Sequence, residues 1–393
     1  MPTDLAMSLL AWLPSQLPEA LRWLERMVCV NSFTTNRTGV NEVGALTAEC
    51  FAELGFRADL VPSSDDAYGS HLFLHRVPGE GLPVVLVTHL DTVFPPDEEA
   101  RNHFHWEPAW EEARIYGHGT VDIKGGTVLI WMMLRALREF APCVFAQTNW
   151  LIAANASEEV LCADFAQRTM ERCPSGTQAV LVFEGGPREG GEWHIVTSRK
   201  GRAEYRLHAE GKGAHAGSAH RLGVNAIVGL CEAVQKCAAL TDEDANLTVN
   251  VARVSGGTVT NRVPHEAVAE LEMRAYEPAV LDNAGAAVLA LSGQVSNGAR
   301  ISAKLLGATP TWPNGATTQA LYAHWAAAAE EVQMKLKSVP RGGLSDANYL
   351  CRLGPTLDGL GPVAQMLTAR SAVPMARSCQ SSSKWIPLCQ RQR

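Results

Sequence analysis

The feature that most constrains the fold is a series of short apolar segments, each followed closely by a histidine or an acidic residue. Pro83–Thr88, Asn149–Ala154 and Ala179–Phe183 read PVVLVT, NWLIAA and AVLVF. Segments of this length and composition are typical of strands buried on both faces of a parallel sheet. Thr127–Phe140 has the periodicity of an amphipathic helix. The alternation of strands and helices predicts an α/β catalytic domain with a mostly parallel central sheet flanked by helices.

The regions outside these segments predict further helices and a second domain. Helical spacing is found over Pro18–Val30 and Val40–Leu54. From Lys200 onward apolar and polar residues alternate, as in Ala269–Ala275, and one helix is predicted around Ile227–Cys237. Strands with one polar face and one helix describe a small α+β domain. We therefore expect a catalytic domain over 1–199 and 309–393, with an inserted domain over 200–308.

Composition limits the class of partner. Of 393 residues, 46% are hydrophobic and 19% charged, which argues against disorder. The net charge of −7 gives no electrostatic basis for binding nucleic acid or an anionic membrane, so a small molecule or peptide is expected. The ten cysteines form no CxxC pair, and the N-terminal residues lack the basic and apolar regions of a signal peptide. These features, with no segment long enough to span a membrane, predict a cytoplasmic protein.

Two of the acidic or histidine-bearing segments contain a candidate metal ligand. In THLDTV, His89 and Asp91 are two residues apart, so on a strand they project to the same side, as a metal-bound imidazole and its orienting carboxylate do. A capping aspartate beside a core histidine is the alternative. In IYGHGTVDIKGG, glycines surround Asp122, which could bridge two cations. A phosphate-binding loop is the alternative, but the carboxylate would repel phosphate and the lysine–serine/threonine pair is absent.

Two further strand ends add carboxylates. Glu158 and Glu159 follow one apolar segment, and Glu184 follows another. Adjacent side chains point in different directions, so one glutamate could bind metal while the other accepts a proton from water. A solvated helix start is the alternative for that pair. Imidazole and carboxylate ligands together suit zinc, with cobalt or manganese as substitutes. A paired-metal site would activate water and polarise a carbonyl.

At these residues the chain resembles the dinuclear zinc family of glutamate carboxypeptidase, succinyl-diaminopimelate desuccinylase, acetylornithine deacetylase and aminoacylase. The resemblance runs from about residue 20 to about 362. It implies two zinc ions per chain, the first held by His89, Asp122 and Glu184, and the second by Asp122 and Glu159. It also implies that Asp91 orients the histidine, that Glu158 is the general base, and that the Asp122–Ile123 peptide is cis.

The inserted segment resembles the family's dimerisation or lid domain. GKGAHAGSAH implies that His215 stabilises the oxyanion in the active site of a second subunit, so a homodimer is expected; packing of a turn is the alternative. GGTVTNRVP implies that Asn261 contacts substrate, and GGLSDANYL resembles a substrate-side loop containing Gly343 and Ser345. Arg274 lies where family members carry an arginine, although it could equally be an exposed strand residue. The segment LLGATPTWP lacks the arginine that holds the substrate carboxylate in the glutamate-specific branch.

The resemblance implies a hydrolase that cleaves a peptide or N-acyl amide beside a free carboxylate. An N-acyl amino-acid deacylase and a catalytically impaired binding homologue are the alternatives. The family ends with a histidine that completes the second metal site, yet no histidine follows His324 and no acidic residue follows Asp358. A change of reading frame near Met366 would restore a histidine. As written, Cys379 or Cys389 could substitute only as thiolates, so we expect a weak second metal site and reduced turnover.

Overall fold

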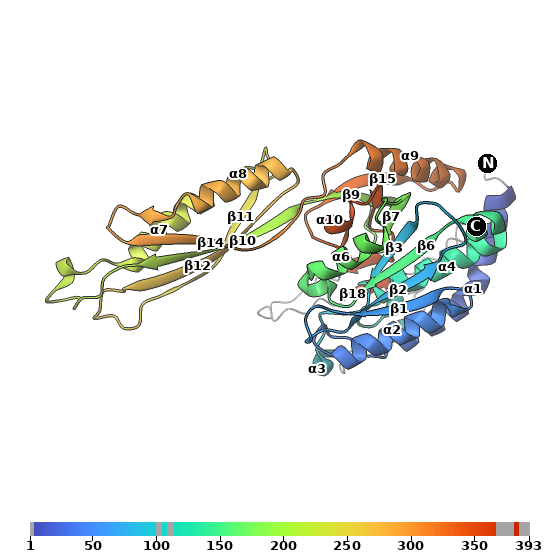
Figure 1. Ribbon diagram of the computed structural model, residues 1–393, viewed down its shortest axis with the longest axis horizontal. Helices are drawn as coiled ribbons and strands as arrows, with labels where there is room; N and C mark the ends of the chain where they lie inside the picture. The colour runs from blue at the N-terminus through green and yellow to red at the C-terminus, as the bar shows by residue number, and fades with distance from the viewer. Residues whose placement is uncertain (1–3, 100–103, 108–113, 367–380, 385–393) are drawn as a thin grey trace. The chain divides into compact units, whose positions relative to one another are not determined.

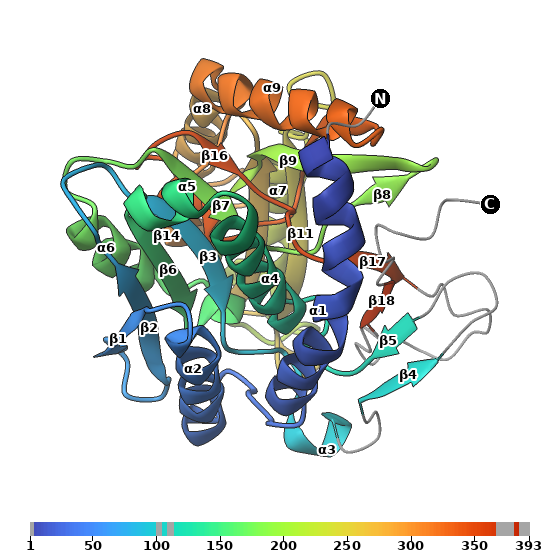
Figure 2. The ribbon, with the colours of Figure 1, turned by 90° about the vertical axis from the view of Figure 1, so that its right-hand side faces the viewer.

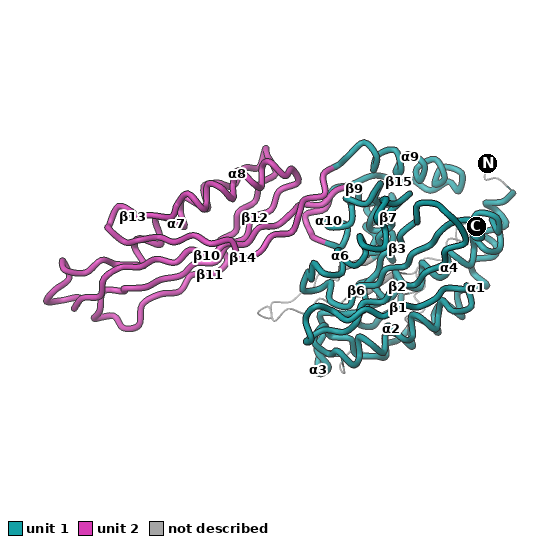
Figure 3. Tube along the Cα trace, in the orientation of Figure 1, with its two compact units in different colours: residues 1–197, 314–340, 345–393 teal, residues 198–313, 341–344 magenta. Residues whose placement is uncertain are grey.

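The computed structural model describes residues 4–99, 104–107, 114–366 and 381–384. Its chain divides into two compact units (Figure 3). The first contains residues 1–197, 314–340 and 345–393, and the second contains 198–313 and 341–344. Within the described residues no helix is long and apolar enough to cross a membrane. The cysteines of this part of the chain are all free.

The first unit is built on a six-stranded sheet with the order β1-β2-β6-β3-β7-β16 (Figure 1). The strands are β1 (Arg57–Pro62), β2 (Ser70–Arg76), β3 (Val84–His89), β6 (Trp150–Asn155), β7 (Ala179–Val182) and β16 (Thr356–Leu357). Only β2 runs against the others, because the β6–β3, β3–β7 and β7–β16 pairs are parallel while β2 is antiparallel to β1 and β6. The predicted mostly parallel α/β sheet is therefore confirmed. The three apolar segments that predicted it are β3, β6 and β7 at its centre.

Helices cover the sheet and bury its apolar residues. They are α1 (Asp4–Val28), α2 (Arg37–Ala52), α3 (Pro96–Glu99), α4 (Lys124–Phe140), α5 (Pro142–Gln147), α6 (Ala163–Arg172), α9 (Ala316–Glu331) and α10 (Ala347–Leu350). In Figure 2, α1 and α4 lie side by side, and α4 also packs against β3. The fully buried Trp131 of α4, Phe51 of α2 and Leu24 of α1 belong to one core cluster. The predicted start of the first helix at Pro18 is wrong: α1 begins at Asp4 and includes Pro14 and Pro18.

Two smaller sheets complete the first unit. One has the order β15-β9-β8, with β8 (Arg188–Glu189), β9 (Glu192–Arg199) and β15 (Leu336–Arg341). The other has the order β17-β18-β5-β4, with β4 (His105–Glu107), β5 (Arg114–Tyr116), β17 (Val363–Met366) and β18 (Ser381–Lys384). The tail showed no strand periodicity in the sequence, yet β18 pairs with both β17 and β5.

An apolar hollow of about 650 Å³ is found in this unit. It is lined by side chains of α1, α4 and α9 and by the segment 359–363. That segment leads directly into β17, so the hollow lies where the described chain passes from the central sheet into the tail.

The second unit is an antiparallel sheet packed against two helices. Its strand order is β11-β12-β10-β14-β13. The strands are β10 (Gly201–Glu210), β11 (Thr248–Gly256), β12 (Glu266–Ala275), β13 (Gly293–Gln294) and β14 (Arg300–Thr309), and the helices are α7 (Ala226–Ala238) and α8 (Pro278–Leu289). Burial alternates residue by residue along β10 and β12, which gave the predicted strand periodicity. The sequence did not predict α8 and β14. Most residues of β14 are at least partly exposed, so its apolar pattern is weak.

Close packing between α4 and β7 gives a first prediction. A Cβ on Gly126, in the first turn of α4, would lie 2.2 Å from the carbonyl oxygen of Phe183, the residue before Glu184. We expect Gly126→Ala to lower the free energy of unfolding by about 1–3 kcal/mol, because the helix must move away from the strand. Urea unfolding measures the change. Gly79→Ala is the control, since its Cβ would enter open space. Equal stability of the two variants would contradict this packing.

Candidate functional site

The candidate site lies at the edge of the sheet where the parallel strands end. His89 is the last residue of β3, and in the parallel pairing it stands opposite Asn155, the last residue of β6. Glu158 follows in the 3₁₀ turn η1 (Glu158–Val160), and Glu184 comes two residues after β7. Because the carboxyl ends of parallel strands share one edge, these side chains converge although they are far apart in the sequence.

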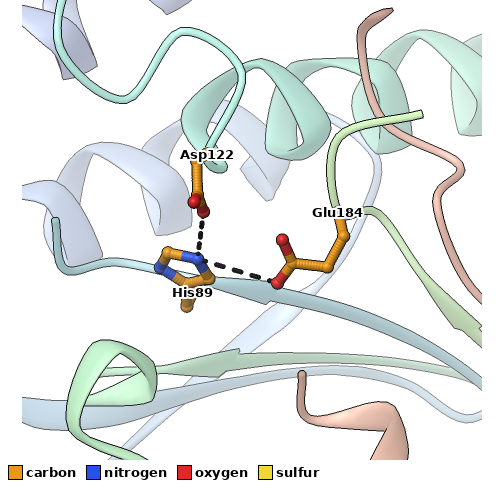
Figure 4. A group of neighbouring side chains, drawn as sticks. All are labelled: His89, Asp122 and Glu184. Carbon is orange, nitrogen blue, oxygen red and sulfur yellow. Dashed lines mark hydrogen bonds and ion pairs between the residues drawn. The ribbon is translucent and has the colours of Figure 1, made fainter. Parts of the chain in front are cut away.

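Three of the four predicted metal ligands form one cluster (Figure 4). His89 Nε2 lies 2.8 Å from Asp122 Oδ1 and 3.8 Å from Glu184 Oε1. One potential ligand atom from each residue lies within 4.8 Å of the other two. The His89 side chain is buried, whereas the Asp122 side chain is half-exposed. The cluster is therefore anchored in the protein interior by His89 and is accessible to solvent at Asp122.

The local backbone explains why Asp122 reaches the histidine. Gly119 has φ +75, a conformation that favours glycine, and a Cβ there would lie 3.0 Å from Thr92 Cγ2. The Asp122–Ile123 peptide is cis, which confirms the prediction made from the resemblance. Lys124 is buried and donates to the carbonyl oxygen of Val30, and burial lowers its pKa to about 8. The ammonium group is therefore tied to the backbone.

The charges of the cluster affect the fourth predicted ligand, Glu159, and the predicted base, Glu158. Burial, and then the nearby Glu184 carboxylate, raise the pKa of Glu158 well above its usual value. Burial, and then Asp122, raise the pKa of Glu159 to about 8. Buried carboxyl groups near other carboxylates hold their protons because burial and the neighbouring negative charge disfavour ionisation, and the nearby His89 offsets this only in part.

This donor set fits a divalent cation. The Nδ1 atom of His89 lies 3.0 Å from the Asp91 carbonyl oxygen and 3.3 Å from its Oδ1, which orients the ring so that Nε2 faces Asp122 and Glu184. Burial lowers the pKa of His89, but its hydrogen bonds to Asp122 and Asp91 outweigh burial and raise that pKa well above its usual value. A cation among these carboxylates would supply the missing positive charge, and the mixed nitrogen and oxygen donors suit zinc.

Asp91 has a second structural role that the sequence did not reveal. Its Oδ1 accepts the backbone N–H of Glu158 at 3.0 Å, and its Oδ2 accepts that of Glu159 at 3.2 Å. Thr34 Oγ1 donates to the same carboxylate at 2.8 Å. Asp91 therefore links the orientation of His89 to the position of both glutamates.

Asp346 is a site residue that was not predicted, although it lies within the motif GGLSDANYL. It is buried, its Oδ1 accepts from Asn155 Nδ2 at 2.9 Å, and burial raises its pKa to about 7. Its neighbour Ser345, predicted to bind substrate, is fully buried and donates to Asp358 Oδ2 at 2.7 Å. The Ser345 hydroxyl is thus engaged inside the protein, and its substrate-binding role stays a prediction.

The remaining predicted substrate residues belong to the second unit. The carbonyl oxygen of Gly343 accepts from Arg199 Nη1 at 3.0 Å. Arg274 forms hydrogen bonds to both carboxylate oxygens of Glu272 and to the carbonyl oxygen of Gly342. The substrate-binding roles of Gly343 and Arg274 stay predictions.

His215 and Asn261 lie side by side in that unit. The backbone N–H of Ala216 donates to the Asn261 carbonyl oxygen at 2.9 Å, and His215 forms a β-bridge with Arg262. His215 is exposed, and its Nδ1 accepts from the backbone N–H groups of Gly217 and Ser218, both at 3.2 Å. A neutral ring with this acceptor carries its proton on Nε2.

The second metal site was predicted to be incomplete because the tail lacks the histidine that would complete it. Cys379 and Cys389 lie outside the described residues. Within the part of the chain that the structure describes, His89, Asp122 and Glu184 are the one group of three side chains whose potential metal ligands lie close together.

Comparison with known proteins supports the resemblance. Residues 197–296 match the peptidase dimerisation domain family. The chain is 27% identical over 259 residues to carboxypeptidase G2 of Pseudomonas sp. (strain RS-16), a match that covers 65% of this chain and 60% of that protein. The chain thus spans less than two thirds of the length of this relative.

Solved structures share the fold over most of the chain. An aminopeptidase PepT from Bacillus cereus superposes with a TM-score of 0.69 at 20% identity, covering 94% of this chain and 93% of that one. A tripeptidase from Staphylococcus aureus gives a TM-score of 0.70 at 17% identity with the same coverage. These findings confirm the predicted fold and the resemblance inferred from the motifs.

The raised carboxyl pKa values predict how pH affects the metal-free protein. Glu159 and Asp346 ordinarily titrate at 4.5 and 3.8, and the fold raises these pKa values to about 8 and about 7. Between about pH 5 and 8 the folded state therefore binds more protons than the unfolded state, so these groups make stability fall as pH rises. Urea unfolding with a chelator at several pH values measures this.

Glu159→Gln is the matched variant for this measurement. It removes one titrating group, so its stability should fall less steeply between about pH 5 and 8 than that of the parent. Saturating zinc should flatten the parent's dependence, because the carboxylates are then ionised in the folded state. A parent and variant with identical pH dependence would contradict the assignment.

Proposed function

We propose that this homologue of carboxypeptidase G2 is a metal-dependent hydrolase that cleaves a peptide or N-acyl amide bond beside a free carboxylate. The observation that carries the proposal is the convergence of His89, Asp122 and Glu184 at the ends of parallel strands, with Glu158 buried beside them. The residue types match hydrolysis by an activated water, because one group of carboxylates binds a cation while another moves a proton.

The cation, zinc with cobalt or manganese as substitutes, would be held by His89, Asp122 and Glu184, and a second by Asp122 and Glu159. Bound there, it lowers the pKa of water and polarises the scissile carbonyl. Glu158 accepts the proton of the attacking water on a carboxylate oxygen and then delivers it to the leaving amine. Its backbone is fixed by Asp91, so the carboxylate is held in place for both transfers.

The second unit is proposed to act across a homodimer. The match of residues 197–296 to a peptidase dimerisation domain supports this assembly. His215 is exposed and carries a free Nε2–H when neutral, so it could donate a hydrogen bond to the oxyanion that forms in a partner subunit. Asn261 lies beside it and is assigned to substrate contact; a short peptide or an N-acyl amino acid is the expected substrate.

Replacement of the proposed base tests the mechanism. We expect Glu158→Gln to lower kcat by about 10²–10⁴-fold while zinc still binds at the His89 cluster, because the amide cannot accept a proton. Hydrolysis is measured on dipeptides, N-acyl amino acids and the same compounds with the carboxylate methyl-esterified. Relative rates on the first two distinguish a carboxypeptidase from a deacylase, and loss of activity on the esters supports recognition of the carboxylate.

Glu139→Gln, at an exposed position of α4, is the control and should retain activity. A Glu158→Gln enzyme as active as its parent would exclude this residue as the base. A parent that hydrolyses nothing in the panel with added zinc would favour a binding homologue.

Metal content tests the incomplete second site. We expect one zinc ion per chain to bind tightly and a second to bind weakly, since Asp122 and Glu159 alone provide too few ligands. Isothermal titration with zinc measures both, and His89→Ala should abolish the tight event. A chain carrying the tail of the shifted reading frame is the matched comparison and should bind two. Two tightly held ions in the chain as written would contradict this expectation.

A further inference from the structure

The segment that carries Glu158 and Glu159 is held in an unusual way. Four consecutive backbone N–H groups, those of residues 156–159, all donate to side chains. Ala156 donates to His71 Nδ1 at 3.1 Å, and Ser157 to Asn155 Oδ1 at 3.0 Å. Glu158 and Glu159 donate to the two oxygens of Asp91. The position of both glutamates therefore depends on three buried acceptor side chains.

His71 is one of these three acceptors, and no role has been assigned to it so far. It lies on β2, its side chain is fully buried, and its ring packs against Phe165 with centroids 5.4 Å apart. An imidazole can accept through Nδ1 only when that nitrogen carries no proton, so the remaining proton is on Nε2. Burial lowers the pKa of His71, which favours this neutral form.

Asp164, in the first turn of α6, faces the other side of the His71 ring. Its Oδ2 lies 3.3 Å from His71 Nε2, a close polar contact that is not aligned well enough to be a hydrogen bond. The same oxygen accepts the backbone N–H of Ser64 at 2.7 Å, and Oδ1 accepts from Cys162 Sγ at 2.8 Å. Burial raises the pKa of Asp164, but hydrogen bonds from Cys162 and Ser64 lower it below its usual range.

Asp164 thus connects both ends of the catalytic segment. It lies 3.3 Å from the ring of His71, which accepts from Ala156 before the glutamates, and it accepts from Cys162 after them. The N–H of Cys162 in turn donates to the Ser157 carbonyl oxygen at 3.4 Å. Asn155, another of the acceptors, is supported similarly, since its side chain donates to Asp346.

We propose that His71, oriented by Asp164, is a positioning residue that fixes the Ala156–Glu159 backbone and thereby places Glu158 and Glu159 for catalysis. The inference rests on the proposed hydrolase function. A small displacement of a base from its reacting proton costs rate more than it costs substrate binding. Loss of the Nδ1 acceptor should therefore lower kcat and leave KM nearly unchanged.

The test compares His71→Leu with His71→Asn. Leucine removes the acceptor and leaves the Ala156 N–H unpaired, whereas the Oδ1 of asparagine can take the place of Nδ1. We expect His71→Leu to lower kcat by about 10- to 100-fold with KM within about twofold, and His71→Asn to recover most of that loss. His75→Leu, on the same strand, is the control and should resemble the parent.

Amide hydrogen exchange read by mass spectrometry gives a result that is independent of turnover. Exchange of residues 156–159 should accelerate in metal-free His71→Leu but not in His71→Asn or His75→Leu. If the parent itself cleaves no substrate, the proposed function fails, while this exchange pattern still tests the positioning role. Should His71→Leu not fold, Asp164→Ala replaces it and is expected to accelerate exchange of the same segment.

Three results would overturn the proposal. The first is a folded His71→Leu enzyme with unchanged kcat. The second is equal impairment of the leucine and asparagine variants when both are folded. The third is exchange at residues 156–159 that does not differ from that of the His75→Leu control.

Discussion

The structure depends on a concentration of acidic groups at one edge of a parallel sheet. Strand ends bring Glu158, Glu159 and Glu184 toward Asp122, and the imidazole of His89 contacts both Asp122 and Glu184. Burying several carboxylates together is unfavourable unless protons or a cation compensate their charge. Lys124 lies close in the sequence, but its ammonium donates to a backbone carbonyl. The same imbalance that raises the carboxyl pKa values would favour a cation bound at the cluster.

Such a cluster needs a rigid support, because mutual repulsion would otherwise separate the carboxylates. The support comes from side chains that accept backbone N–H groups. Asp91 accepts two successive N–H groups while also orienting His89, so one residue couples the predicted metal ligand to the proposed base. The acceptors are held in turn by Asp164 and Asp346. Negative charge therefore serves both inside the cluster and in the shell that positions it.

The sequence could predict the first layer of this arrangement but not the second. His89 and Glu184 follow apolar segments, and the rule that parallel strands end at one edge brings such residues together, whereas Asp122 lies in the glycine-rich segment before α4. His71 lies in SHLFLHR on the single reversed strand, where no local pattern marks a polar contact with residue 156. Asp164 begins an ordinary helix, where an acidic residue is expected for electrostatic reasons alone. Contacts between distant residues, which determine these roles, leave no periodicity in the chain.

The tail connects the chemistry of the site with the packing of the fold. The family resemblance implies that a histidine should follow the segment 359–363, and the sequence provides none in the frame as written. That same segment borders the apolar hollow between α1, α4 and α9. A contiguous apolar surface of this kind is typical of a site where another structural element packs. A single altered segment would thus account for two separate features, the expected shortage of ligands at the second metal site beside half-exposed Asp122 and the apolar hollow beside the point where the chain leaves the sheet.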